Sequence, residues 1–282
     1  IFIFLNICRA QIPQETIVGK LSDTMLSDVS GITPSRLHKD LFYVHNDRGK
    51  GDSGRFYAIA STGELKAIWH FEGDATDCED IAIGPGPRKN RSYIYLADIG
   101  DNEGSRPSIK VYRFEEPTAL PEHASVASKI KGKAFTLVYP DGPRDAETIM
   151  IDPIEKLLYI ISKREDSVGI YTASLRLNGN KVNRLKKEGK IYFEGKPAEK
   201  WITSGDISPD GRQILIRAKD NVYYWRRNNN EPIHRTLQNP SYKYPGFIAR
   251  PRQEAIAFSN DGKGFYVAAE GRFTPIYYYV LE

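Results

Sequence analysis

The feature that most restricts the fold is a repeat of short, tyrosine-rich strands with a period of about fifty residues. Each unit has an apolar strand, a turn, a second apolar strand that ends in a polar cluster, and a third strand rich in tyrosine. Five such units occur, with second strands at residues 41–44, 93–96, 157–161, 213–216 and 265–268. Repeated antiparallel units of this length predict an all-β fold, a five-bladed β-propeller.

The two ends of the chain are expected to meet in one blade. The fifth unit stops at its third strand, residues 275–281, while residues 15–21 form a separate strand near the N-terminus. Adding the N-terminal strand to the last blade would leave no open edge between the termini. The fourth strands expected for the other units are residues 65–71, 133–138, 190–193 and 233–237. Six blades are the alternative, if the insert at about residues 115–131 contains strands.

Composition excludes several classes of protein. The chain carries 40 basic and 36 acidic residues, so its surface is mixed and is not typical of a nucleic-acid-binding protein. No phosphate-binding loop, dinucleotide fingerprint or nucleophile elbow is present, and the five histidines lack the spacing of zinc ligands. We expect residues 11–282 to form one monomeric domain without a membrane span.

Residues 1–10 indicate the compartment. They form a short apolar run that ends at the small residue Ala10, as the end of a secretory signal peptide does. A buried first strand is the alternative. Cleavage after Ala10 would remove Cys8, and Cys78 would then have no partner for a disulfide. Cys78 lies between Asp77 and Glu79, so we expect a packed, unreactive thiol. The sequence therefore predicts a secreted or periplasmic protein.

Three first strands carry a glutamate at a position where the apolar alternation predicts a core residue. Glu79, Glu147 and Glu254 are each followed by Ile at the second position and an apolar residue at the fourth. First strands line the channel of a propeller, so these carboxylates are expected to face one another. Buried carboxylates need a shared partner, and we expect Ca²⁺. The alternative is that each glutamate accepts hydrogen bonds from amides of the next blade.

The two remaining first strands are expected to contribute hydroxyl groups, from Ser27 and from Thr203, with Ser204 as the alternative to Thr203. The order hydroxyl, Glu, Glu, hydroxyl, Glu, one per blade, resembles the axial calcium site of the calcium-activated nucleotidases (apyrases), which are five-bladed propellers. This resemblance implies an axial calcium ion. It also implies that Asp47, within residues 45–49, is a carboxylate of a nucleotide site.

A second resemblance concerns residues 40–120. The segments His45-Asn46-Asp47, residues 79–85 and residues 97–102 are similar to those of a group of secreted bacterial propellers of uncertain function. That resemblance implies a fold and a compartment, and almost nothing about activity.

Polar clusters at the ends of the second strands are expected to share one face, the upper face, with the glutamates. Their mixed charge suits an anionic ligand, such as a phosphoester or an acidic sugar. The alternative is ordinary loop chemistry, because the rims of propellers are polar in any case. The ligand-binding residues that we expect are His45, Asn46, Arg48, Asn102, Arg144, Lys163, Arg164, Arg217, Lys219 and Arg272.

These observations predict a calcium-binding propeller whose upper face binds an anionic small molecule, a glycan or a protein. The alternative is a calcium-dependent phosphoester or nucleotide hydrolase, in which Asp47, Asp98 or Asp101 positions water. In that case the phosphoryl charge would be stabilised by Arg48, Lys163 and Arg217. The chain has no counterpart of the acidic N-terminal segment that the apyrases use in catalysis, which favours binding. Whether the protein is an enzyme, and whether the calcium is structural, stay open at this point.

Overall fold

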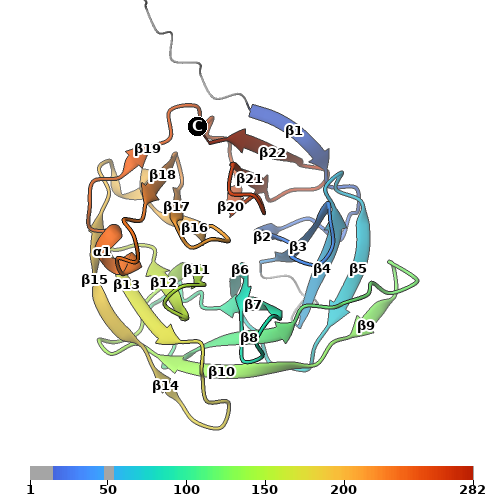
Figure 1. Cartoon of the computed structure of the whole chain (residues 1–282), viewed down its shortest axis with the longest axis horizontal. Coiled ribbons are helices and arrows are strands. Elements are labelled where there is room, and N and C mark those ends of the chain that lie inside the picture. The colour runs from blue at the N-terminus through green and yellow to red at the C-terminus, as the bar shows by residue number, and fades with distance from the viewer. Residues whose placement is uncertain (1–14, 48–53, 282) are drawn as a thin grey trace, which may run out of the picture.

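Five small sheets form a ring, and each sheet is one blade of a β-propeller (Figure 1). The structure is a computed structural model that describes residues 15–47 and 54–281. Within these residues the prediction of five blades is confirmed.

Blades 1 and 2 each contain five strands. From the channel outward, blade 1 consists of β2 (Val29–Pro34), β3 (Leu41–Asn46), β4 (Arg55–Ala60), β5 (Leu65–His70) and β9 (Ala127–Lys129). Blade 2 consists of β6 (Cys78–Pro85), β7 (Ser92–Asp98), β8 (Ile109–Glu115), β10 (Gly132–Val138) and β14 (Asn183–Arg184).

Blades 3, 4 and 5 each contain four strands among the described residues. Blade 3 consists of β11 (Ala146–Asp152), β12 (Leu157–Ser162), β13 (Ser167–Ser174) and β15 (Lys186–Tyr192). Blade 4 consists of β16 (Ile202–Ile207), β17 (Gln213–Ala218), β18 (Asn221–Arg226) and β19 (Tyr242–Lys243). Blade 5 consists of β20 (Gln253–Phe258), β21 (Gly264–Ala269), β22 (Pro275–Val280) and β1 (Glu15–Lys20). A 3₁₀ turn (Pro197–Glu199) precedes β16, and helix α1 (Ile233–Thr236) lies between β18 and β19.

The N-terminal strand closes the ring, as expected. β1 pairs antiparallel with β22, with Glu15 opposite Tyr279, and the two strands lie side by side in Figure 1. The Glu15 carboxylate also forms an ion pair with Arg250, with 2.6 Å between Oε1 and a guanidinium nitrogen. Because β1 completes the last blade, the first and last parts of the described chain hold each other in place.

The apolar core lies between the blades. There are five clusters of buried hydrophobic residues within the described chain, and each draws its members from two neighbouring blades. Tyr43 and Phe56 of blade 1, for example, share a cluster with Phe114 of blade 2. The tyrosines that mark the repeat in the sequence are therefore the residues that join one blade to the next.

Two expectations about the outer strands need correction. The insert near residues 115–131, expected as a surface loop, contains β9, which pairs parallel with β5 of blade 1 and adds no sixth blade. Residues 233–237 were expected as the fourth strand of blade 4, but residues 233–236 form α1 with Leu237 as its C-cap, and β19 takes the strand position. The reason for the helix is that Ile233 and Leu237 are four residues apart, so one helical face buries both of them against blade 3.

Candidate functional site

Every first strand contains a β-bulge at the same place. The pairing registers of β2, β6, β11, β16 and β20 with their neighbours each skip one residue, and the skipped residues are Ser30, Glu79, Glu147, Thr203 and Glu254. A bulge leaves one residue outside the regular pairing and redirects its side chain. All three predicted glutamates therefore occupy equivalent positions at one end of the channel.

The bulges also decide which hydroxyl groups belong to this set. In blade 4 the bulged residue is Thr203 and not Ser204. In blade 1 the expected residue, Ser27, lies before β2, and the bulge position belongs to Ser30. The prediction for blade 1 was wrong by three residues, because the segment before β2 has the same alternation of apolar and polar residues as the strand itself. Ser27 instead donates a hydrogen bond to Asp28, at 2.8 Å.

Three carboxylates gather on the side of blades 1 and 2. Asp47 follows β3, Asp77 precedes β6, and Glu79 is the bulge residue of β6; one oxygen of each lies within 4.8 Å of the others. Asp77 and Glu79 are buried and Asp47 is half-buried. Burial, followed by repulsion from Asp47 and Asp77, raises the pKa of the Glu79 carboxyl well above its usual value. The cluster therefore has a strong preference for a proton or a cation.

The backbone of Gly100 forms one wall of this acidic cluster. A Cβ atom placed on Gly100 would lie 2.1 Å from Glu79 Oε1 and 2.7 Å from Asp77 Cγ. Only a residue without a side chain leaves both carboxylates in their positions. The cluster is thus held closely by the loop that follows β7.

The other two glutamates have basic partners. Glu147 forms an ion pair with Lys163, and Glu254 interacts electrostatically with Arg217. Arg217 is fully buried and donates a hydrogen bond to Thr203 Oγ1 at 2.7 Å. Burial lowers the pKa of its guanidinium to about 10 and raises the pKa of the Glu254 carboxyl. The five bulge residues therefore divide into an acidic side, around Glu79, and a side where charges are paired.

Two of the three expected catalytic carboxylates accept hydrogen bonds from neighbouring loop residues. Asp98 is buried and accepts hydrogen bonds from Asp77 N (3.0 Å) and from the guanidinium of Arg106 (2.8 Å). Asp101 accepts from the backbone N–H groups of Ser105 and Arg106, both at 2.9 Å. These contacts shape the loop that carries Gly100. Only Asp47, the third of these residues, belongs to the acidic cluster.

The basic rim residues of blade 3 form ion pairs with carboxylates. Arg144 contacts Glu165 at 2.8 Å, and Arg164 contacts Asp145 at 2.5 Å. Arg164 also donates to Asn102 and lies over the ring of Trp201, 4.8 Å from its centroid. The charges of Arg144 and Arg164 are therefore largely neutralised by carboxylates of the rim itself.

The remaining expected ligand-binding residues differ in accessibility. His45 is fully buried, with Nδ1 2.9 Å from Asn46 O, and the Asn46 amide donates to Met25 O at 2.6 Å. Lys219 and Arg272 are exposed. Arg48 lies outside the described residues, as do residues 1–10, which were predicted to be the end of a signal peptide.

Two buried aspartates deeper in the channel, Asp80 and Asp206, were not predicted from the sequence. Asp80 accepts hydrogen bonds from Ile81 N (2.9 Å), from Ile149 N of blade 3 (3.0 Å) and from Ser204 Oγ of blade 4 (3.1 Å). Asp206 accepts from Ile207 N (2.8 Å) and from Phe258 N of blade 5 (2.9 Å).

Both aspartates accept hydrogen bonds from backbone amides of the next blade. This is the role that was considered above as the alternative to calcium binding for the three glutamates. The sequence contained a signal for them, since Asp80 and Asp206 are acidic residues directly before isoleucine in first strands that are expected to be buried. Burial raises the pKa of both carboxyls, for Asp206 to about 6.

Cys78 lies at the start of β6, beside the acidic cluster, and is half-buried. Burial and the charges of Asp98 and Glu79 raise the pKa of its thiol well above the usual value. A thiol in this state is a weak nucleophile, in agreement with the prediction of an unreactive cysteine.

Comparisons with known proteins do not assign a function. The chain matches no protein-family model, and no curated protein shows significant similarity to it. Within the described residues, no helix has the length and apolarity needed to cross a membrane.

Proposed function

We propose that the upper face binds a calcium ion through Asp47, Asp77 and Glu79, and that this ion helps to hold an anionic ligand. The observation that carries the proposal is the convergence of three carboxylates within 4.8 Å of one another. Two of them are buried, where repulsion between like charges is least screened by water. A bound cation would remove that repulsion.

The donor set fits calcium. All three side chains offer hard oxygen ligands, and carboxylates that bind with one or two oxygens supply between three and six of the about six to eight ligands that Ca²⁺ takes. Asp47 is half-buried, so water or a ligand atom has a route to the remaining positions. The proposed site lies off the axis, on the side of blades 1 and 2, rather than among all five bulge residues.

An anionic ligand is favoured by the charges next to the cluster. Lys163 interacts electrostatically with both Glu79 and Glu254, so it lies between the acidic side and the paired side of the funnel. A calcium ion together with Lys163 and the exposed Lys219 would present positive charge to a phosphate or carboxylate. Hydrolysis is the less favoured alternative, because Asp98 and Asp101 hold loop backbone and are poorly placed to activate water.

The calcium proposal is tested by thermal unfolding in Ca²⁺ and in EGTA. We expect Ca²⁺ to raise the melting temperature, since a ligand at a hundred times its Kd stabilises the native state by about 2.7 kcal/mol. Glu79→Gln should lose this effect, and Glu103→Gln, an exposed acidic residue of the neighbouring loop, should retain it. An equal calcium response in both variants, or none in the wild-type protein, would contradict the proposal.

The ligand is tested by calorimetric titration of inorganic phosphate, a nucleoside monophosphate and a hexuronic acid, each with and without Ca²⁺. Calcium-dependent binding of at least one of these anions is expected, and it should weaken in Lys163→Met. Release of phosphate from a nucleoside diphosphate, lost in Asp47→Asn, would instead favour the hydrolase. Absence of binding by all three anions would restrict the proposal to a structural ion.

A further inference from the structure

The outer edges of blades 1 and 2 each receive a fifth strand from the next blade. The insertion between β8 and β10 of blade 2 provides β9, which pairs parallel with β5 of blade 1. The insertion between β13 and β15 of blade 3 provides β14, which pairs parallel with β10 of blade 2. Both added strands lie along the last residues of their host, at Ile68–His70 of β5 and at Leu137–Val138 of β10.

Blade 3 has the same outer edge but no fifth strand among the described residues. β15 is the last strand of its sheet, with β13 as its only ladder neighbour. The corresponding insertion of blade 4, residues 227–241, forms α1 instead of a strand. Arg227 ties this insertion to Asp152 of blade 3 at 3.1 Å, and Ile233 N donates to Glu155 at 2.9 Å. The helix thus packs on blade 3 without pairing with the end of β15.

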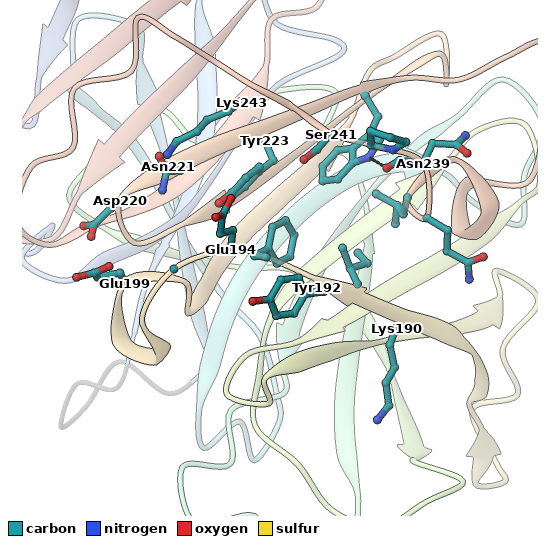
Figure 2. A pocket seen from close by; sticks show the side chains of 17 residues that line it. Lys190, Tyr192, Glu194, Glu199, Asp220, Asn221, Tyr223, Asn239, Ser241 and Lys243 are labelled. Carbon is teal, nitrogen blue, oxygen red and sulfur yellow. Dashed lines mark hydrogen bonds between the residues drawn. The ribbon is translucent and has the colours of Figure 1, made fainter.

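A groove of about 1050 Å³ lies beside the end of β15, between this strand and β18 of blade 4 (Figure 2). One wall is the end of β15 and the residues after it, 190–195. The other wall contains Asn221, Tyr223 and Trp225 of β18 and residues 237–243. The groove begins at the C-terminal end of β15, which is where β9 and β14 join their own host strands. An unpaired strand edge beside such a groove is a template for another strand.

The charges of the groove complement the residues that fill the other two positions. Lys129 of β9 lies opposite the last residue of β5, and Arg184 of β14 lies opposite the last residue of β10. The last residue of β15 is Tyr192, which is 61 % exposed. Beyond it the groove is lined by the carboxylates of Glu194, Glu199 and Asp220 and by Lys243. Glu199 also forms an ion pair with Lys196 at 3.3 Å, and Lys200 Nζ lies 4.5 Å from the centroid of the Tyr192 ring. In Figure 2 Glu199 and Asp220 lie at one end of the groove and Lys190 at the other.

We propose that this groove binds an extended segment of a partner protein, which adds to β15 as a parallel fifth strand and places a Lys or Arg opposite Tyr192. Backbone hydrogen bonds to β15 would provide affinity, as they do when peptides add to a sheet edge. The basic side chain would provide specificity, because it would contact Glu194, Glu199 and Asp220 in this groove. At an ordinary sheet edge the same side chain would contact only solvent. This groove lies on the outer rim of the ring and does not involve the acidic cluster of the upper face.

The chain itself supplies a probe for the proposal. Residues 124–131 contain β9 and its lysine, so a fluorescent peptide of this sequence is a suitable fifth strand. Fluorescence anisotropy in EGTA should show saturable binding, which keeps the result independent of calcium. Replacing the lysine that corresponds to Lys129 by glutamate in the peptide should weaken binding about tenfold, the usual effect of losing one charge-assisted hydrogen bond. Amide shifts of the ¹⁵N-labelled protein should concentrate at residues 190–194 and 239–241.

Two variants locate the binding site. Glu194→Lys should weaken the wild-type peptide about tenfold and favour the glutamate-containing peptide. Glu122→Lys, an equal change at an exposed residue remote from the groove, should leave both affinities unchanged. Melting temperatures would verify that both variants fold.

Three results of the peptide experiments would overturn the proposal. These are absence of saturable binding, amide shifts outside the groove, and equal affinity of Glu194→Lys and the wild-type protein for the basic peptide. A concentration-dependent dimer in light scattering, with β15 protected from amide exchange, would assign the edge to a second copy of this chain and would also overturn it.

Discussion

Replacing Arg227 by alanine should destabilise the propeller more than any change at an exposed ion pair. The Arg227 side chain is fully buried, and its guanidinium lies 3.1 Å from Asp152 and 3.2 Å from Glu155. It also donates to the carbonyl oxygen of Gly211, at 3.2 Å. The residue therefore joins the insertion of blade 4 to the first hairpin of blade 3.

The expected magnitude follows from the partners that the substitution leaves behind. Asp152 is fully buried, so in Arg227→Ala its carboxylate would lose its counter-ion without gaining water. Breaking a buried pair by removing one partner costs about 3–5 kcal/mol. Since domains are stable by about 5–15 kcal/mol in total, the loss should be a large fraction of the stability.

Urea unfolding followed by the fluorescence of the three tryptophans measures this loss. The control is Arg252→Ala, which removes an arginine that is 63 % exposed and lies 3.2 Å from Glu270. An exposed pair contributes about 0–1 kcal/mol, so the control should unfold almost as the wild-type protein does. If Arg227→Ala lost no more free energy of unfolding than Arg252→Ala, the reasoning from burial would be refuted.

Three further predictions concern the channel. Asp80→Ala should lower the free energy of unfolding by about 3 kcal/mol or more, because it leaves donors from three blades without an acceptor; a loss below 1 kcal/mol in urea would contradict this. Gly100→Ala should abolish the calcium-dependent rise in melting temperature, because the atoms nearest to its Cβ are those of the Glu79 and Asp77 carboxylates, which would have to move; an unchanged calcium response would contradict it. The pKa of Asp206 is raised from 3.8 to about 6 by burial, so its contribution to stability is full below pH 3.8 and is lost as the pH rises through 6. Asp206 should therefore contribute a decrease of about 3 kcal/mol between pH 4 and 7, and the loss of stability over this range should be smaller by about that amount in Asp206→Asn than in the wild-type protein, as measured by urea unfolding at both pH values.

The repeat of strands was predictable because it is a local property of the chain. Period-2 alternation and tyrosine content depend only on neighbouring residues, so the second and third strands of every blade, and the first strands of all blades but blade 1, could be placed from the sequence. The closing strand β1 was predictable by the same logic, since the last unit contains too few strands. The segment at residues 233–237 could not be assigned in this way, because five residues with an apolar side chain at each end fit a strand or a helix equally well, and packing on blade 3 decided.

The site was predictable in part. The equivalence of Glu79, Glu147 and Glu254 came from one shared motif, and the bulges place all three at the same level of the channel. Their different environments did not follow from the motif. Asp47 and Asp77 come from strand ends of two blades, and Lys163 reaches Glu147 from the end of a second strand.

The sequence by itself determined the class of fold and the residue types at the channel, and it favoured five blades over six, because these depend on patterns repeated along the chain. Only the tertiary structure decided which glutamate lies in an acidic cluster, which ones have basic partners, and which outer edges have no fifth strand among the described residues. Distances between residues of different blades depend on the curvature of the ring and on the bulges of its first strands. Those quantities arise when the five interblade clusters pack together, and no short segment of the sequence contains them.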